Sequence, residues 1–298
     1  MTLSRRQFIT LPLAMLVLPP ALAQRTNEAT LLTRAIPSTG ERLPAVGLGT
    51  AIVFDSDDAE TRGRATDVLQ ALAAGGGRLV DTASTYGDAE TVLGAVIAAA
   101  KSRDRFFVAT KVEALDIDEF RRSLARLRVP SVDLLQLHNV RDARQSLVQF
   151  RDWKAQGLCR YVGVTSTFPR DFPAMEAVIK REKPDFVELN YSLGDREVEA
   201  RLLPACAEAG SAVLTALPFG RNSLFRAVGG KALPEWAKDF DAASWGQFFL
   251  KYLIGNPAVT AVIPGTTKAE HMDDNLAAGR GRLPDDAQRR KMVQFFES

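Results

Sequence analysis

The chain has 298 residues, of which 46% are hydrophobic and 25% are charged, and its formal net charge is +2. This composition is ordinary for a globular protein, and the near balance of charge gives no support to nucleic-acid binding. Two cysteines, Cys159 and Cys206, exclude a disulfide framework; each lies among apolar residues, so we expect packed thiols. We predict no metal site.

The first 23 residues have the features of a targeting segment. Residues 4–8 are Ser-Arg-Arg-Gln-Phe, an apolar run covers residues 11–18, and Ala-Leu-Ala ends at Ala23. This pattern resembles a twin-arginine translocation signal. The apolar run is short, and Pro12, Pro19 and Pro20 lie in or just after it, which favours cleavage near Ala23 over a retained anchor.

From this segment we predict that the twin-arginine export machinery recognises the chain. We also predict that the mature protein is periplasmic in a Gram-negative-type cell and has no stable membrane insertion after cleavage. Residues 24–298 would form one domain with 36 basic and 36 acidic residues, because cleavage removes two arginines and no acid.

The next residues predict a small hairpin and a first buried strand. Residues 31–36 and 41–46 are strand-like and flank a Pro-Ser-Thr-Gly turn over residues 37–40. Residues 46–50, Val-Gly-Leu-Gly-Thr, predict a buried strand whose glycines allow another group close to the backbone.

A repeating pattern then predicts the architecture. Short apolar runs recur about every 26 residues, at 79–80, 106–109, 132–135, 161–164, 186–189 and 212–214, with a last one at 261–263. Segments with helical periodicity lie between them, at 89–101, 117–128, 143–156, 172–181 and 198–209, and a closing helix is expected at 285–296. Alternating strands and helices indicate parallel strands, and about eight units predict a (β/α)8 barrel.

Two features qualify this prediction. The pattern is interrupted over residues 218–245, where several Gly and Pro residues indicate a long loop with one helical turn. A doubly wound open sheet is the alternative fold, but no Gly-x-Gly-x-x-Gly sequence opens any of the expected helices.

Four ionisable side chains are expected at the carboxyl ends of adjacent barrel strands. Asp81, Lys111 and His138 end three consecutive strands, and Tyr86 lies in the loop after the first of these. Catalytic groups of α/β barrels lie at this face. We expect Asp81 to orient Lys111 and Lys111 to lower the pKa of the Tyr86 phenol, which then transfers a proton.

Each of these residues also has a structural interpretation. Asp81 and Lys111 could form a salt bridge at the barrel mouth, Tyr86 could pack in its loop, and His138 could be a hydrogen-bonded core residue. Their order on consecutive strands favours chemistry instead, with His138 donating a hydrogen bond to a carbonyl oxygen. Such a set needs a hydride donor, and a reduced nicotinamide is the natural candidate.

Five segments, in order, resemble motifs of the aldo/keto reductase family. They are residues 46–50, 81–87 (Asp-Thr-Ala-Ser-Thr-Tyr-Gly), 109–112 (Ala-Thr-Lys-Val), 133–138 (Asp-Leu-Leu-Gln-Leu-His) and 262–266 (Val-Ile-Pro-Gly-Thr). The resemblance covers nearly the whole mature chain. It implies an NAD(P)H-dependent carbonyl reductase that uses Asp81, Tyr86, Lys111 and His138.

The resemblance also implies a set of cofactor contacts. They are Gly49, Thr50, Thr165, Ser166, Glu188, Asn190, Pro218, Gly220, Pro264, Gly265, Thr266, Thr267, Lys268, His271 and Asn275. Three positions depart from the family pattern: Thr165-Ser166 replaces Ser-Asn, Glu188 replaces a usual glutamine, and no aromatic residue lies near Ala216 to stack on nicotinamide.

The last of these contacts surround the start of a helix expected from about Ala269. Backbone N–H groups and hydroxyls at a helix N-terminus favour a phosphate. Lys268 could meet a ribose 2′-phosphate, while His271 occupies the usual arginine position, so we expect NADPH, with NADH possible.

Two other functions and the substrate entrance remain open. Lys111 could instead form a Schiff base in a lyase. The chain could also be a non-catalytic nucleotide-binding or accessory protein. Phe54, Phe168, Phe219 and Phe225 could line an apolar entrance or pack in the core.

Overall fold

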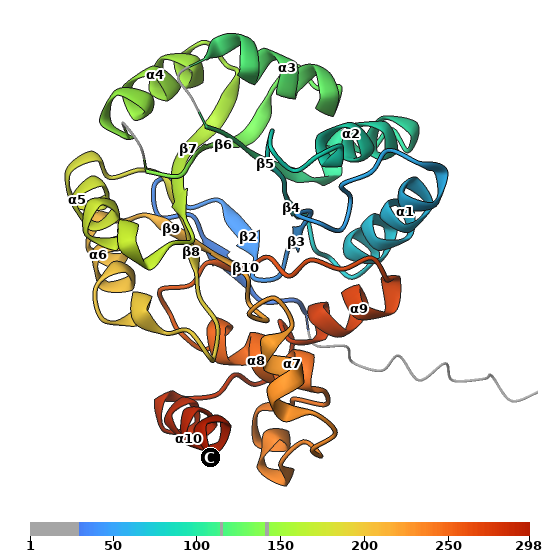
Figure 1. Ribbon diagram of the computed structural model, residues 1–298, viewed down its shortest axis with the longest axis vertical. Coiled ribbons are helices and arrows are strands. Elements are labelled where there is room, and N and C mark those ends of the chain that lie inside the picture. The colour runs from blue at the N-terminus through green and yellow to red at the C-terminus, as the bar shows by residue number, and fades with distance from the viewer. Residues whose placement is uncertain (1–29, 114–115, 141–142) are drawn as a thin grey trace, which may run out of the picture.

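A computed structural model describes residues 30–113, 116–140 and 143–298. The twin-arginine pattern and the predicted cleavage position lie outside the described residues. Figure 1 shows strands around a central axis inside a ring of helices, with α7 (Ser223–Val228) and α10 (Asp286–Glu297) beside the ring. None of the helices in the described ranges is both long and apolar enough to cross a membrane.

Within these ranges, eight strands form one sheet in chain order, and every neighbouring pair is parallel. They are β3 (Leu48–Gly49), β4 (Leu79–Asp81), β5 (Phe107–Val112), β6 (Val132–His138), β7 (Cys159–Ser166), β8 (Phe186–Asn190), β9 (Ala212–Ala216) and β10 (Ala261–Val262). Parallel bridges from Val46 to Val262 and from Gly49 to Gly265 join the first strand to the last. The predicted (β/α)8 barrel is confirmed.

The barrel seam explains the two glycines at residues 49 and 265. A Cβ on Gly49 would lie 2.8 Å from the carbonyl oxygen of Ile263, and one on Gly265 would lie 3.2 Å from that of Gly49. The close approach expected at the first strand is therefore made by the chain that follows β10. A side chain at Gly49 would push the seam apart.

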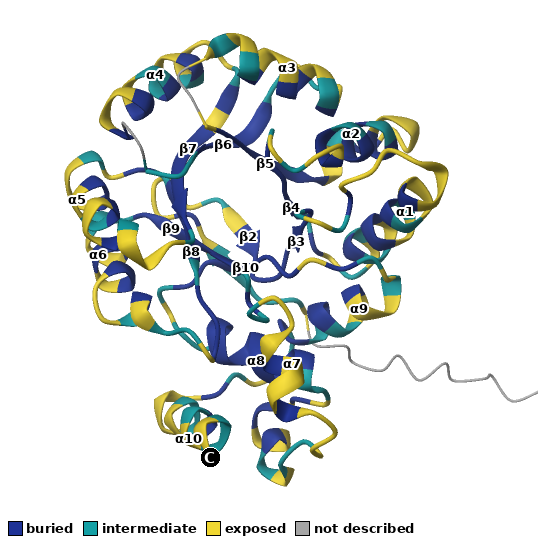
Figure 2. Ribbon diagram, viewed as in Figure 1, coloured by how far each residue is buried: buried dark blue, intermediate teal, exposed yellow. Residues whose placement is uncertain are grey.

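The outer helices mostly match the predicted segments. They are α2 (Ala89–Ala99), α3 (Ile117–Leu127), α4 (Ala143–Ala155), α5 (Phe172–Glu182), α6 (Leu202–Ala209), α8 (Trp245–Ile254) and α9 (Ala269–Ala277). Two of the helices lie outside the predicted segments: α1 (Ala59–Ala74) precedes β4, and α8 follows the segment predicted as a long loop. Figure 2 shows the buried faces of these helices turned toward the strands.

Two helical predictions need correction. The segment predicted as one helix over 198–209 is divided into a 3-10 turn, Glu197–Glu199, and α6. The predicted long loop of residues 218–245 holds more helix than one turn, because α7 is followed by a six-residue 3-10 helix, Glu235–Phe240. Phe240 of that helix is fully buried against Phe248, so tertiary packing supports a segment that has little helical periodicity.

Side-chain caps fix several helix ends. The carboxylate of Asp285 accepts from the backbone N–H of Gln288, whose side chain accepts from the backbone of Asp285, and this reciprocal box starts α10. Gly210, at φ 73°, ends α6 in the left-handed conformation that glycine adopts without strain.

The barrel interior has an apolar lower part and a polar upper part. The hairpin of β1 (Thr33–Ala35) and β2 (Arg42–Pro44), which confirms the predicted one, closes the floor with Ile36 and Leu43. The inward residues above it are apolar, among them Leu79, Phe107, Leu134, Tyr161, Phe186 and Leu214. Side chains alternate along a strand, so the inward positions nearer the carboxyl ends include 81, 111, 136 and 188.

Both cysteines are packed thiols, as predicted. Cys159 and Cys206 are buried and free, and burial raises the pKa of each to about 12. The described residues contain no group of His, Cys, Asp or Glu side chains that could hold a metal ion.

Candidate active site

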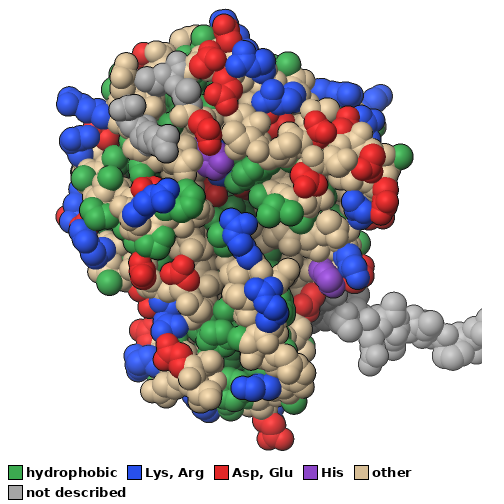
Figure 3. Space-filling model, in the orientation of Figure 1, with side chains coloured by type: hydrophobic (Ala, Val, Ile, Leu, Met, Phe, Trp, Pro, Cys, Tyr) green, Lys and Arg blue, Asp and Glu red, His purple; other side chains and the backbone are tan. Residues whose placement is uncertain are grey.

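The four predicted catalytic residues meet at the carboxyl ends of the strands. Asp81 ends β4, Lys111 is the penultimate residue of β5 and His138 ends β6, while Tyr86 lies in the loop between β4 and α2. Figure 3 shows a histidine at a hollow in the upper part of this face, with acidic side chains next to it.

Lys111 is the centre of the cluster. Its ammonium is paired with the carboxylate of Asp81 and donates to the carbonyl oxygen of Thr82 at 3.1 Å. The side chains of Lys111 and Asp81 are 0% and 3% exposed, so water does not screen this pair. The predicted orientation of Lys111 by Asp81 is present as a direct contact.

A second carboxylate reaches the same ammonium. Oε2 of Glu188, on β8, lies 3.3 Å from Nζ of Lys111, and the Glu188 side chain is 3% exposed. Nε2 of Gln136 donates to Oε2 of Glu188 at 2.7 Å and lies 3.5 Å from Oδ1 of Asp81. Sequence reasoning placed Glu188 among cofactor contacts and missed its contact with Lys111, and it did not single out Gln136.

This arrangement shifts the pKa values of both members of the Asp81–Lys111 ion pair. Burial lowers the pKa of Lys111, but Asp81 and Glu188 outweigh burial, so the pKa lies above its usual value. Burial, and next the charge of Glu188, raises the pKa of the Asp81 carboxyl despite the opposing effect of Lys111.

Tyr86 lies over this cluster, with its ring centroid 5.2 Å from Nζ of Lys111. Burial raises the pKa of Tyr86 to about 12; Lys111 opposes the rise, and the charges of Glu188 and Asp81 add to it. Lys111 lowers the Tyr86 pKa, as expected. The net shift is nevertheless upward, contrary to the expectation, because burial and the charges of two carboxylates outweigh the effect of one ammonium.

His138 completes the set. Its ring centroid lies 5.7 Å from that of Tyr86 at an interplanar angle of 83°, and Nδ1 lies 3.2 Å from Oγ1 of Thr85. Burial, and next the charge of Lys111, lowers the pKa of His138 to about 4. The imidazole is therefore neutral near pH 7 and carries one N–H that can be donated.

The family assignment follows from a comparison with known proteins. The model of the aldo/keto reductase family matches residues 45–290. The chain belongs to the aldo/keto reductase family.

Individual relatives are distant. Uncharacterized oxidoreductase YqkF of Bacillus subtilis is 27% identical over 187 residues, which cover 54% of this chain and 59% of that protein, so the chain spans less than two thirds of this relative. Methylglyoxal reductase YeaE of Escherichia coli is 28% identical over 250 residues, 79% of this chain and 85% of that protein. An aldo-keto reductase from Klebsiella pneumoniae, solved in complex with NADPH, matches with a TM-score of 0.74 at 23% identity, over 90% of this chain and 95% of that one, which supports the fold.

In this family member the predicted nicotinamide contacts differ in whether local hydrogen bonds already engage their side chains. Thr165 is buried on the inward side of β7, beside His138 in register. The hydroxyl of Ser166 donates to the Asp171 carboxylate at 2.8 Å, and Nδ2 of Asn190 donates to that of Asp195 at 2.6 Å. Thr165 is thus the contact least engaged by local hydrogen bonds.

The loop after β9 takes a constrained path beside these residues. Leu217 and Gly220 have φ angles of 51° and 54°, and Pro218 between them is buried. Ala216 pairs in register with Asn190 and leaves no aromatic ring there. The predicted contacts Pro218 and Gly220 therefore lie on a loop whose backbone shape is held by turn conformations.

The predicted phosphate contacts surround the start of α9. Lys268 is the N-cap residue and its side chain makes no capping hydrogen bond, which leaves first-turn N–H groups without a side-chain acceptor. Thr266 Oγ1 accepts from the backbone N–H of Lys268 at 3.1 Å, and Pro264 is buried. Thr267 is half-buried, His271 is exposed, and Asn275 is buried, so these side chains differ in access.

The open start of α9 fits a phosphate group. The helix dipole favours an anion at this end, and the Lys268 side chain is 58% exposed with Glu270 at 3.9 Å. Thr50 Oγ1, at the end of the first strand, is buried without a hydrogen-bond partner among the described residues. These features are compatible with a dinucleotide held across the seam.

The four phenylalanines expected near the entrance divide into two groups. Phe54 is fully buried and belongs to the core. Phe168 and Phe225 are 43% and 37% exposed, and Phe219 packs on Phe225 with ring centroids 4.9 Å apart. The entrance interpretation is wrong for Phe54 and stays a prediction for the other three.

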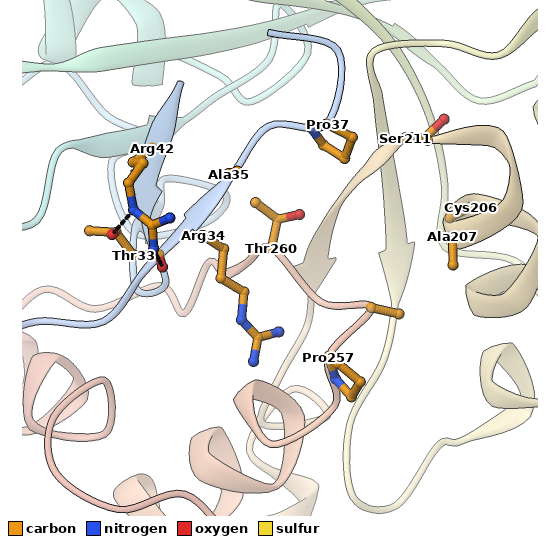
Figure 4. A pocket seen from close by; sticks show the side chains of 12 residues that line it. Thr33, Arg34, Ala35, Pro37, Arg42, Cys206, Ala207, Ser211, Pro257 and Thr260 are labelled. Carbon is orange, nitrogen blue, oxygen red and sulfur yellow. Dashed lines mark hydrogen bonds between the residues drawn. The ribbon is translucent and has the colours of Figure 1, made fainter. Parts of the chain in front are cut away.

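A cavity of about 410 Å³ lies at the opposite end of the barrel, between the hairpin, α6 and the residues before β10. Figure 4 shows Arg34 crossing this cavity toward the end of α8. Its guanidinium donates to the carbonyl of Asn256 at 2.6 Å and to those of Val259 and Ile254. These contacts fasten the hairpin to a helix end, and none of the predicted site residues lines this cavity.

Proposed function

We propose that this aldo/keto reductase is an NAD(P)H-dependent oxidoreductase that reduces an aldehyde or ketone to an alcohol, with Tyr86 as proton donor. The observation that carries the proposal is the buried Asp81–Lys111 pair beneath Tyr86, next to a neutral His138. The bound cofactor would supply the hydride.

The protein side chains supply the remaining chemistry. Tyr86 gives its proton to the carbonyl oxygen, and the ammonium of Lys111 stabilises the phenolate that is left. Asp81 holds Lys111 in place. His138, as a neutral donor, hydrogen-bonds the same oxygen and orients it.

The cofactor-binding residues support NADPH as the reductant. The start of α9, with Thr266 and the backbone near Lys268, would hold the pyrophosphate end, and the exposed Lys268 side chain would approach a 2′-phosphate. Thr165 and Asn190 would contact the nicotinamide end. The Klebsiella pneumoniae relative was solved with NADPH, which supports the same choice.

The lyase alternative has little support in the geometry. A Schiff base requires a neutral amine as the nucleophile. Two carboxylates at the ammonium hold the pKa of Lys111 above its usual value, so the amine stays protonated.

We also propose that the chain is exported. The Ser-Arg-Arg-Gln-Phe sequence of residues 4–8 and the apolar run after it support recognition by the twin-arginine machinery, cleavage near Ala23 and a periplasmic location. Replacement of Arg5 and Arg6 by lysine should retain the protein inside the cell. Periplasmic fractionation and N-terminal sequencing would measure this, and unchanged export would contradict it.

A nucleotide titration and a carbonyl panel test the catalytic proposal. NADPH and NADH are titrated into purified protein, and NADPH oxidation is then followed by its ultraviolet absorbance. Methylglyoxal is the first carbonyl to try, since YeaE is a methylglyoxal reductase. NADPH binding with turnover supports the proposal, binding without turnover of any carbonyl supports the non-catalytic alternative, and no binding contradicts both.

A further inference from the structure

The polar layer of the barrel has one cation and two anions. Lys111 is the only ammonium or guanidinium that the structure pairs with Asp81 or Glu188 among the described residues. All three side chains are 3% exposed or less. A surplus negative charge in such a site is unfavourable unless donors surround it or a proton is retained.

Donors from two strands hold Glu188 in this position. Lys111 approaches Oε2 at 3.3 Å from β5, and Nε2 of Gln136 approaches it at 2.7 Å from β6. Oε1 of Gln136 is buried without a partner, so the amide is oriented by what its nitrogen contacts. The carboxylate is therefore held as an acceptor beside the ammonium.

Gly163 allows β6 to reach β8 across β7. It lies in register with Gln136, and a Cβ there would be 3.1 Å from Cγ of Gln136 and 2.9 Å from the carbonyl oxygen of Phe186. A side chain at residue 163 would occupy the space between Gln136 and Glu188. β7 therefore leaves open, at Gly163, the space through which Gln136 contacts Glu188.

The titratable groups around Glu188 come from three strands and one loop. Asp81 lies on β4 and Lys111 on β5, while Tyr86 in the loop after β4 and His138 on β6 both respond to the charge of Glu188. Its effect on Tyr86 opposes that of Lys111. Glu188 therefore offsets part of the influence that the Lys111 ammonium has on the Tyr86 phenol.

We propose that Glu188 is a positioning residue that shares the ammonium of Lys111 with Asp81 and so keeps Tyr86 in its protonated, proton-donating form. It does not touch the reacting atoms in this assignment. Its relevance to catalysis rests on the proposed function, but its effect on Tyr86 does not, because that effect exists without cofactor or substrate.

The experiment is a spectroscopic titration of Tyr86 in the full chain. The protein contains four tyrosines, so the ultraviolet difference between each protein and its Tyr86→Phe counterpart isolates one phenol. In Glu188→Gln the amide keeps the size and an acceptor oxygen but loses the charge. We expect the Tyr86 midpoint to fall by about one pH unit, a roughly tenfold gain in phenolate at fixed pH.

A matched control uses Glu90, a carboxylate that is 1% exposed outside the barrel interior. It accepts from Thr110 at 2.5 Å and from Arg126 at 2.8 Å, so Glu90→Gln removes a comparably buried charge. The Tyr86 midpoint should not move in this variant. A similar fall in both variants would mean that general loosening of the barrel, and not Glu188, shifts Tyr86.

A second variant covers the case in which Glu188→Gln does not fold. Gln136→Met removes the amide donor that holds the Glu188 carboxylate beside Lys111, so this carboxylate is less well fixed there and the Tyr86 midpoint should fall by a smaller amount. If NADPH turnover is found, the alkaline limb of its pH profile should move in the same direction. A Tyr86 midpoint that is unchanged or higher in Glu188→Gln would overturn the inference, whatever the turnover assay shows.

Discussion

The two ends of the barrel carry opposite arrangements of charge. At the mouth, one cation, Lys111, contacts two carboxylates, Asp81 and Glu188. At the floor, one carboxylate, Glu41 of the hairpin turn, contacts two guanidiniums, Arg78 and Arg160. Arg160 also pairs with Asp133, which contacts Arg103, so the floor network has three guanidiniums and two carboxylates. The mouth cluster therefore has a surplus carboxylate and the floor network a surplus guanidinium.

Water makes the difference between the two clusters. The floor side chains Arg78, Arg160 and Glu41 are 37%, 51% and 22% exposed, so solvent screens their surplus charge. The mouth side chains are 3% exposed or less. The same pairing that fastens the hairpin at the floor therefore shifts proton affinities at the mouth, where it can serve catalysis.

The largest effect is expected from breaking the mouth cluster. Lys111→Met leaves two buried carboxylates without their cation, which should lower the free energy of unfolding by about 3–5 kcal/mol at pH 7. Urea unfolding followed by circular dichroism measures the loss. The loss should shrink at low pH, where the carboxyls are protonated; a pH-independent loss would point to lost packing instead.

Removal of the proposed proton donor is expected to act on the rate alone. Tyr86→Phe keeps the ring and removes only the hydroxyl, so kcat for carbonyl reduction should fall roughly 10²–10⁴-fold. The dissociation constant for NADPH should stay within about a factor of three, because the phenol is not needed to bind nucleotide. Full activity in this variant would exclude Tyr86 as the donor.

His138 should make the mouth sensitive to acid. Its folded pKa of about 4 lies below its usual 6.5, so the unfolded chain binds the proton first and stability is lost as the pH falls from 6.5 to 4. The loss should reach about 3 kcal/mol. Unfolding of the natural protein and of His138→Asn at several pH values isolates this part; parallel curves would contradict it.

The smallest effect is expected at the floor. Glu41→Gln removes the charge that Arg78 and Arg160 share, but solvent already screens it, so unfolding should become easier by about 1 kcal/mol or less. The Tyr161 hydroxyl, which donates to Glu41 at 2.7 Å, still finds an acceptor in the amide. A loss as large as that of Lys111→Met would remove the contrast between the two ends.

The fold was predictable because its signals are local. Short apolar runs at regular intervals mark the strands, and the Pro-Ser-Thr-Gly turn marks the hairpin. The convergence of Asp81, Lys111 and His138 followed from barrel geometry, since each ends or nearly ends a strand. The 3-10 helix Glu235–Phe240 was missed because its stability comes from aromatic packing between distant segments.

The charge state of the site was not predictable from the same signals. The sequence shows an acid at position 188, but not its contact with Lys111. That contact depends on Gln136 of β6 reaching Glu188 of β8 past Gly163 of β7, and the closed barrel sets the register of these three strands. The net pKa shift of Tyr86 depends on burial, which a motif does not report.

The barrel seam has a consequence for how the molecule opens. β3 and β10 are two residues long each, and two bridges join this edge, whereas β6 and β7 pair over six positions. Amide hydrogens at the seam should therefore exchange with solvent sooner than those between β6 and β7. Several predicted nucleotide contacts, including Gly49, Thr50, Gly265 and Thr266, flank this seam from both sides. A dinucleotide that contacts both sides would stabilise the seam against local opening. Slower amide exchange at Gly49 would therefore measure nucleotide binding without any turnover.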